Sequence, residues 1–216
     1  MEKANISIID CGMGNLGSVV NIIEHIGHET TIISSPKEVL DAEKLIFPGV
    51  GHWDKGVERL INSGLKPAIL KAVDAGTPLM GICLGMQLLF SHSEEGENKG
   101  LGLIPGRIKR FDFSRLPEEL TQGRHKLRVP HMGWNAVTSC RINDPMLAGL
   151  DDDVSFYFVH SYHSSDVPSE CQLLTCHYGY DFVCGVNQDN VWGFQFHPEK
   201  SHKFGMQLLK NFAGNL

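Results

Sequence analysis

The sequence predicts an α/β fold, with a mainly parallel open sheet, helices on both faces and a β-rich second half. Strand-like and helix-like segments alternate in the first half, which is typical of a parallel sheet covered on both sides. Short β-type segments then follow one another between about residues 100 and 195, and an amphipathic segment closes the chain. A length of 216 residues suffices for a full core and fits one domain, which we expect to span residues 1–216.

The first half contains four expected strands and three expected helices. The strands are residues 6–10, 30–34, 44–49 and 78–83, and the helices are residues 18–27, 56–64 and 66–76. In the first helix, Ser18 is the expected N-cap, Gly27 the expected stop, and Val19 and Ile23 belong to one apolar face.

The second half contains six segments with β-type composition, at residues 107–111, 135–139, 154–162, 172–178, 182–188 and 191–196. Residues 187–193, Asn-Gln-Asp-Asn-Val-Trp-Gly, are typical of a hairpin connection. Residues 203–214 carry apolar side chains at helical spacing and predict a helix that packs on the core.

Composition and charge argue against several classes of partner. A formal net charge of −6 disfavours nucleic acid, and the short basic run at residues 124–128 lies beside acidic Glu118 and Glu119. The first residues contain no apolar stretch typical of an export signal, and no run approaches the length of a membrane span. We therefore expect a cytoplasmic protein that binds neither nucleic acid nor membrane.

Six cysteines are expected to stay reduced in that compartment. A metal site built from Cys171, Cys176, His177 and Cys184 is conceivable, but their alternating apolar neighbours favour strand residues, and the cysteine spacings match no zinc motif. We expect neither a metal nor a cofactor.

Residues 81–85, Gly-Ile-Cys-Leu-Gly, fit the nucleophile-elbow pattern with cysteine in place of serine. A strand that turns sharply into a helix raises Cys83 over the edge of the sheet, the helix dipole favours its thiolate, and the backbone N–H of Leu84 points toward a developing oxyanion. Alone, the same residues also fit an inert, tightly packed strand–helix corner.

Residues 194–201, Phe-Gln-Phe-His-Pro-Glu-Lys-Ser, supply the base that such a nucleophile requires. If the backbone stays extended through Pro198, His197 and Glu199 lie on the same side, so that the carboxylate orients the imidazole. With Cys83 these two residues form a candidate catalytic triad. The glycine-rich segment 48–51 is a further candidate for an oxyanion donor, although it also fits an ordinary loop.

The segments Pro-Gly-Val-Gly (48–51), Gly-Ile-Cys-Leu-Gly-Met-Gln-Leu-Leu (81–89) and Gly-Phe-Gln-Phe-His-Pro-Glu-Lys-Ser (193–201) resemble, in order and spacing, the class I glutamine amidotransferase family. The resemblance covers nearly the whole chain. It implies that Cys83 attacks the side-chain amide of L-glutamine, His197 moves the protons and Glu199 orients His197. It also implies that Val50 and Leu84 donate oxyanion-hole N–H groups. Glutamine would be bound by Gly49, Gly51, Gln87, Glu95, Ser161 and Tyr162.

Within the family, three segments resemble the glutaminase subunits of imidazole glycerol phosphate synthases: residues 12–19, 129–135 and 157–163. This implies ammonia transfer to a separate (β/α)8-barrel cyclase subunit, in a heterodimer that makes imidazole glycerol phosphate and AICAR in histidine biosynthesis. The face meeting that subunit would contain Asn15, His131, Met132, Trp134 and Tyr157.

Some positions depart from the subunit's usual pattern. Cys11 stands where a tyrosine is usual and Gly17 where an arginine is usual, and residues 117–126 form an extra polar run. These departures leave open a paralogous glutaminase that supplies ammonia for amidine formation on an amino sugar in surface-polysaccharide biosynthesis. A stand-alone γ-glutamyl hydrolase or cysteine peptidase, and a non-catalytic scaffold, are the alternatives from other classes.

Overall fold

A computed structural model describes residues 3–123, 126–141, 143–150 and 153–214. Its helices are α1 (Leu16–His25), α2 (Pro36–Leu40), α3 (Trp53–Asn62), α4 (Leu65–Asp74), α5 (Leu84–Gln87), α6 (Glu118–Thr121) and α7 (His202–Gly214). Short 3₁₀ turns occupy Pro145–Leu147, Ser169–Cys171 and Pro198–Lys200.

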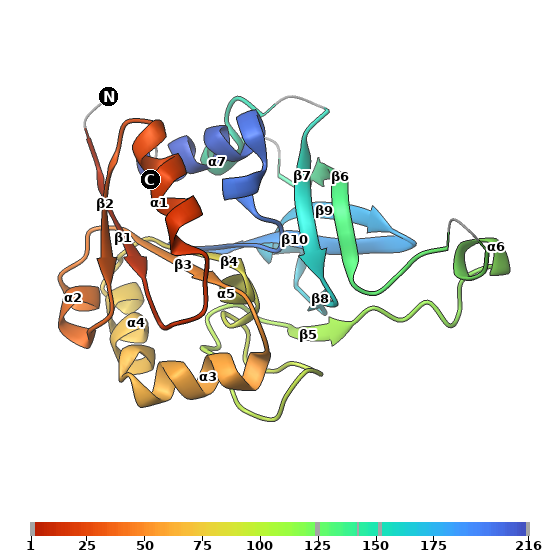
Figure 1. Ribbon diagram of the computed structural model, residues 1–216, viewed down its shortest axis with the longest axis horizontal. Helices are drawn as coiled ribbons and strands as arrows, with labels where there is room; N and C mark the ends of the chain where they lie inside the picture. Colours follow the sequence, from red (N-terminus) through yellow and green to blue (C-terminus); the bar gives the residue numbers. More distant parts are fainter. Residues whose placement is uncertain (1–2, 124–125, 142, 151–152, 215–216) are drawn as a thin grey trace.

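The strands form one mixed sheet (Figure 1). They are β1 (Asn5–Ile9), β2 (Glu29–Ile33), β3 (Leu45–Gly49), β4 (Leu79–Cys83), β5 (Arg107–Arg110), β6 (His131–Ser139), β7 (Ser155–His160), β8 (Tyr162–Ser165), β9 (Gln172–Tyr178), β10 (Tyr180–Gln188) and β11 (Val191–Phe194). The order is β2-β1-β3-β4-β11-β10-β9-β6-β7, with β5 paired to β8 and β8 to β10.

Between the named strands, parallel ladders join β2, β1, β3, β4 and β11, and the other ladders are antiparallel. The predicted α/β class with a β-rich second half is confirmed, and the antiparallel strands of that half make the complete sheet mixed. The predicted hairpin is also present, since Gln188 pairs with Val191 across a two-residue turn.

Helices cover both faces of the parallel strands, as Figure 1 shows, with α1 and α7 on one side and α2, α3 and α4 on the other. Two apolar clusters correspond to these faces. Ile8 packs in the cluster of α1 and α7, and its neighbour Ile9 packs in the cluster of α3 and α4. Because successive strand residues point to opposite faces, a strand buried on both sides needs apolar side chains on each face, as Ile8 and Ile9 provide in β1.

Several local expectations are corrected. Helix α1 begins at Leu16, and the side chain of Asn15, not Ser18, is the N-cap: its Oδ1 accepts a 3.4 Å hydrogen bond from the Ser18 N–H. Asn is as good a cap as Ser, and the earlier one in the sequence fixes the start. Helix α2 was not expected; its signal is the capping box between Ser35 and Glu38.

One expectation about a strand also changes. The segment 154–162 is divided, because β7 ends at His160 and β8 begins at Tyr162. The expected strand at residues 44–49 is present: the β3–β4 ladder extends to Gly49, which pairs with Cys83.

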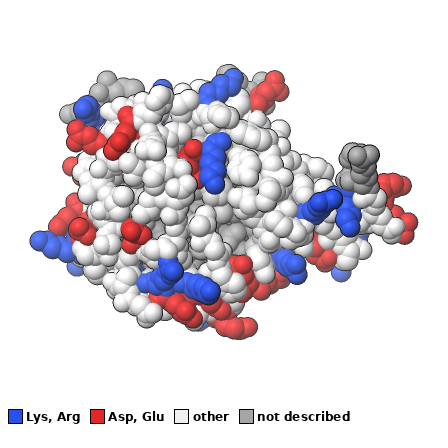
Figure 2. All heavy atoms as spheres, viewed as in Figure 1, with Lys and Arg blue, Asp and Glu red and all other residues white. Residues whose placement is uncertain are grey.

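The surface carries mixed charge on the face shown in Figure 2, where acidic and basic side chains are interspersed. Of the basic run at 124–128, residues 124 and 125 lie outside the described residues. Among the described residues, the helices are too short or too polar to span a membrane.

Candidate active site

Three neighbouring parallel strands bring the candidate residues to one edge of the sheet. Strand β4 lies between β3 and β11, and Gly49 of β3 is directly opposite Cys83 of β4. Strand β11 ends at Phe194, and the chain then runs on to His197. The carboxyl ends of parallel strands share one edge, which is where open α/β sheets bind ligands.

Cys83 has a backbone conformation that residues with a side chain rarely adopt, with φ 54° and ψ −112°. The neighbouring glycines make the turn possible. A Cβ on Gly81 would lie 2.8 Å from the backbone of Gly85, and a Cβ on Gly85 would lie 1.8 Å from the carbonyl oxygen of Phe47. The sharp strand-to-helix turn predicted from the sequence is therefore present.

Burial affects the thiols of the five other cysteines. Burial raises the pKa of the Cys176 thiol to about 12 and that of Cys11 to about 11. Burial also raises the pKa of Cys140, Cys171 and Cys184. These thiols stay protonated near neutral pH, which leaves them poor nucleophiles.

His197 and Glu199 form a buried pair, with 2.7 Å between Nδ1 and Oε1 and side chains only 3% and 4% exposed. The contact does not arise through an extended backbone, as expected, but through the 3₁₀ turn at Pro198–Lys200. Pro198 is well suited to the first position of such a turn because its φ is already fixed. The His197 N–H donates to the Tyr157 carbonyl at 2.9 Å, and the His197 carbonyl accepts from the Ser201 hydroxyl at 2.6 Å.

The electrostatics of this pair favour a charged imidazole. Burial alone would lower the pKa of His197, but its interactions with nearby Cys83 and with hydrogen-bonded Glu199 outweigh burial and raise the pKa to about 10. The arrangement is suited to a protonated imidazole whose orientation Glu199 fixes.

A cavity of about 330 Å³ opens at Cys83. Its lining residues are Val50, Gly51, Cys83, Leu84, Gln87, Glu95, Pro130, Val159, His160, Ser161, Tyr162 and His197. Of the residues expected to bind glutamine, Gly49 alone is not part of this lining; it is buried beside Leu84. Glu199, which contacts His197, is also not part of the lining.

Two polar side chains of the cavity are held in place by long-range hydrogen bonds. Glu95 Oε2 accepts from the backbone N–H of Trp53 at 2.9 Å. Gln87 Nε2 donates to the Tyr162 carbonyl at 3.1 Å and to Gln195 Oε1 at 3.0 Å. Gln195 was not singled out in the sequence, although a polar residue between Phe194 and Phe196 is a signal for a buried hydrogen-bonded group.

The segment after β3 has its candidate oxyanion donor engaged elsewhere. The backbone N–H of Val50 donates to the carbonyl oxygen of Met13 at 2.8 Å, while the Val50 side chain is 47% exposed. In this conformation that N–H is committed to the loop after β1.

The residues expected on a partner face divide between surface and interior. Met132 and Trp134 are 61% and 47% exposed, and Asn15 is also exposed. Tyr157 is half-buried against Trp134. The expectation is wrong for the His131 side chain, which is fully buried.

The reason for that burial is strand alternation in β6, which turns His131 away from Met132 and Trp134. His131 Nδ1 instead lies 2.9 Å from His160 Nε2.

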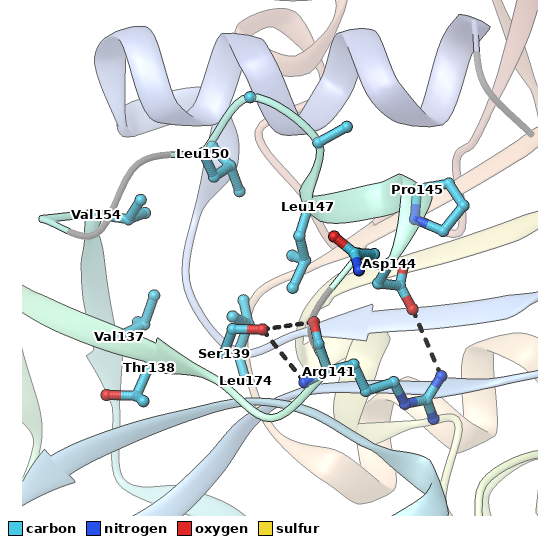
Figure 3. Close-up of a pocket in the computed structure, with 13 residues that line it drawn as sticks. Val137, Thr138, Ser139, Arg141, Asp144, Pro145, Leu147, Leu150, Val154 and Leu174 are labelled. Carbon is cyan, nitrogen blue, oxygen red and sulfur yellow. Dashed lines mark hydrogen bonds and ion pairs between the residues drawn. The ribbon is translucent and has the colours of Figure 1, made fainter.

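A larger cavity, of about 730 Å³, lies away from these residues (Figure 3). Its wall includes β6 residues and the segment 143–150, and Arg141 in that wall is 3.5 Å from Asp144 in an ion pair. Neither Cys83 nor His197 lines it. Within the described ranges, His, Cys, Asp and Glu side chains form no group of three or more suited to a metal ion.

A family model and individual relatives of known name both match this chain over nearly its whole length. Residues 7–216 match the family model described as Glutamine amidotransferase class-I. A protein of Pseudomonas aeruginosa named imidazole glycerol phosphate synthase subunit HisH 2 is 45% identical over 209 residues, covering 96% of this chain and 98% of its own. Imidazole glycerol phosphate synthase subunit HisH of Wolinella succinogenes is 43% identical with the same coverage.

Solved structures share the fold at low sequence identity. The structure of PurLQS from Thermotoga maritima superposes with a TM-score of 0.74 at 16% identity, covering 99% of both chains. A Thermoplasma acidophilum protein described as part of a putative GMP synthase gives a TM-score of 0.70 at 17% identity, covering 99% of this chain and 94% of its own.

Proposed function

The chain belongs to the class I glutamine amidotransferase family, and from that membership we propose that it is a glutaminase subunit that hydrolyses L-glutamine to glutamate and ammonia. The observation that carries the proposal is the Cys83 elbow, which shares a cavity wall with His197, and the ring of His197 is in turn held by the buried carboxylate of Glu199. We further propose that residues 1–216 act as one glutaminase domain.

In the proposed reaction, the Cys83 thiolate attacks the side-chain carbonyl carbon of glutamine and forms a tetrahedral oxyanion. The protonated His197 gives its proton to the amide nitrogen, the C–N bond breaks and ammonia leaves. His197 then takes a proton from water, which attacks the γ-glutamyl thioester; the C–S bond breaks and glutamate is released. Glu199 keeps the ring oriented throughout.

Further residues in the cavity wall, together with Gly49 beside it, are proposed to bind glutamine and stabilise the oxyanion. Leu84 and Val50 would donate their backbone N–H groups to it. The proposed glutamine contacts are Gly49, Gly51, Gln87, Glu95, Ser161 and Tyr162. A volume of about 330 Å³ is adequate for one amino acid.

Ammonia released into water at neutral pH becomes ammonium, which is not a nucleophile, so a useful glutaminase must deliver its product directly. We propose that the recipient is a separate (β/α)8-barrel cyclase of histidine biosynthesis, in keeping with the names of the relatives. The exposed apolar side chains of Met132 and Trp134 support a docking face at β6. We propose the cytoplasm as the compartment, in keeping with six cysteines that are all free thiols.

The test is steady-state hydrolysis of glutamine in the presence of saturating cyclase subunit. Cys83→Ala and Cys83→Ser should abolish glutamate formation while binding to the cyclase subunit persists. A Cys83→Ala protein with the wild-type rate would overturn the proposal. Rapid hydrolysis of γ-glutamyl peptides by the chain alone would favour the stand-alone hydrolase instead.

The acceptor is tested separately, by coupling the same assay to two synthase subunits. Transfer of nitrogen to the imidazole-forming cyclase supports the histidine pathway. Transfer only to an amino-sugar amidination enzyme would overturn that pathway and leave the glutaminase chemistry intact.

A further inference from the structure

Gln195 is a fully buried polar side chain that the proposed mechanism does not use. Its backbone N–H donates to the Cys184 carbonyl at 2.9 Å, which fixes the residue just beyond the end of β11. Its amide lies between two site residues: Oε1 is 3.0 Å from Gln87 Nε2, and Nε2 is 3.9 Å from Cys83 Sγ.

Tyr162, Gln87, Gln195 and Cys83 form a series of hydrogen bonds, and the carbonyl of Tyr162 fixes which atom donates in each of them. The backbone carbonyl of Tyr162 can only accept, so the group of Gln87 that faces it at 3.1 Å must be Nε2. Gln87 Nε2 therefore also donates to Gln195, and the acceptor on Gln195 must be Oε1. That choice leaves the Nε2 of Gln195, a donor, facing the sulfur.

The same reasoning explains why a buried amide is suited to this place. An unpaired amide in the interior is costly, and Gln195 uses its two ends on two different groups. A sulfur that carries negative charge accepts an N–H more strongly than a neutral thiol does. The N–H is therefore directed at the atom on which charge accumulates before attack.

We propose that Gln195 is a positioning residue for the Cys83 sulfur. Tyr162 orients Gln87, Gln87 orients Gln195, and the Nε2 of Gln195 holds the sulfur in position and stabilises its negative charge. Its value to glutamine hydrolysis rests on the proposed function, but the interaction itself exists without glutamine. Both amide hydrogens of Gln87 are donated to Tyr162 and Gln195. A ligand group that hydrogen-bonds to Oε1 of Gln87 must therefore be a donor.

The test is the rate at which iodoacetamide alkylates Cys83 in the free chain, near neutral pH and without glutamine, followed by mass spectrometry of the Cys83 peptide. Gln195→Met keeps an unbranched side chain of similar length but removes both polar ends. Gln87→Met leaves Gln195 in place but removes what orients it, and the double variant combines the two. Gln172→Met is the matched control, because Gln172 donates one 2.8 Å amide hydrogen bond to the Val167 carbonyl and lies outside the cavity.

Gln195→Met should slow alkylation by about three- to tenfold, in line with the loss of one hydrogen bond. Gln87→Met should slow it by a smaller factor, and the double variant should be no slower than Gln195→Met, because the two residues act as one chain. Gln172→Met should match the wild type. A purely structural role for Gln87 and Gln195 would leave alkylation unchanged.

Wild-type alkylation in Gln195→Met, or a double variant whose factor is the product of the single ones, would overturn the inference. If Gln195→Met gives no cooperative melting transition, the test rests on Gln87→Met alone. An alkylation rate of Cys83 equal to that of the wild type in Gln87→Met then overturns the inference. Glutamine turnover is measured in parallel with the cyclase subunit. Absence of turnover in the wild type would overturn the proposed function, whereas the alkylation series would still test Gln195.

Discussion

The backbone N–H of Val50 donates to the carbonyl oxygen of Met13 at 2.8 Å, which ties the segment after β3 to the loop after β1. One of the two proposed oxyanion donors is thus occupied in the free chain. Since Asn15, in the same loop after β1, is exposed, a docking subunit has direct access to the loop that holds Val50.

We predict from this contact that docking of the cyclase subunit with its acceptor substrate reorients Val50 and completes the oxyanion hole. The free chain should then hydrolyse glutamine about 10²- to 10³-fold more slowly than the complex, which is the usual effect of one oxyanion donor. The measurement is glutamate formation with and without the partner and acceptor. Equal rates in the two states would contradict the prediction.

His197→Ala should reduce partner-stimulated glutamine hydrolysis by about 10⁴-fold or more, because His197 moves protons in both steps. The loss of rate in Glu199→Ala should be smaller than that in His197→Ala by a factor of roughly ten or more, because Glu199 orients the ring and transfers no proton. The measurement is kcat in the complex. Equal losses in the two variants would show that Glu199 does more than orient His197.

The pH dependence follows from the pKa of His197, which is raised to about 10 in the folded chain from an ordinary value of 6.5. Below about pH 6.5 the ring is protonated in both folded and unfolded chains, so the stabilisation from its partners is fully present; it is lost as pH rises through about 10. The proton donor for ammonia release is lost over the same rise, so kcat should fall there.

Glu199→Gln removes the carboxylate and should move this alkaline fall in kcat to lower pH by about one unit or more. The matched control is Asp181→Asn, which breaks an exposed pair whose Nδ1–Oδ1 distance, to His177, is 2.6 Å. The measurement is kcat between about pH 6 and 11. If the pH profile of kcat shifts equally in both variants, the alkaline fall does not arise from the titration of His197.

Gly85→Ala should destabilise the fold by about 3 kcal/mol or more, since the new Cβ would lie 1.8 Å from the Phe47 carbonyl oxygen and the backbone must move. Gly17→Ala is the control: it lies in α1, and the nearest atom to its new Cβ is 3.8 Å away. That change should stabilise by about 0.5–1 kcal/mol. Urea unfolding measures both, and equal midpoints would refute the steric argument.

Trp134→Ala should weaken binding to the cyclase subunit by about tenfold or more, because exposed tryptophans dominate many interfaces. Ile61→Ala is the control, since Ile61 is 54% exposed on α3 and is not part of the β6 face. Binding is measured by calorimetry or surface plasmon resonance. If both variants bind as the wild type does, Trp134 does not belong to the docking face.

Much of the fold could be predicted because its signals are local. The elbow at residues 81–85, the hairpin around Asp189 and the apolar strands each depend on neighbouring residues. The register of Gly49 against Cys83 does not, and neither does the extent of antiparallel pairing, because both depend on contacts between distant segments.

The site shows the same division. Cys83, His197 and Glu199 could be selected from motifs, but the 3₁₀ turn that joins the last two could not be distinguished from an extended chain by spacing. The burial of His131 follows from the two-residue period of β6, which places it opposite to Met132 and Trp134. The contacts of Gln195 and Val50 required the three-dimensional structure, because their partners lie far away in the sequence.

The central claim is that Cys83 is the nucleophile that attacks glutamine. It is tested most directly by incubating the chain, with saturating cyclase subunit, with an electrophilic glutamine analogue and locating the adduct by mass spectrometry. The account predicts one adduct, on Cys83, which excess glutamine prevents and which Cys83→Ser lacks. An adduct on another cysteine, or no protectable adduct on Cys83, would contradict it.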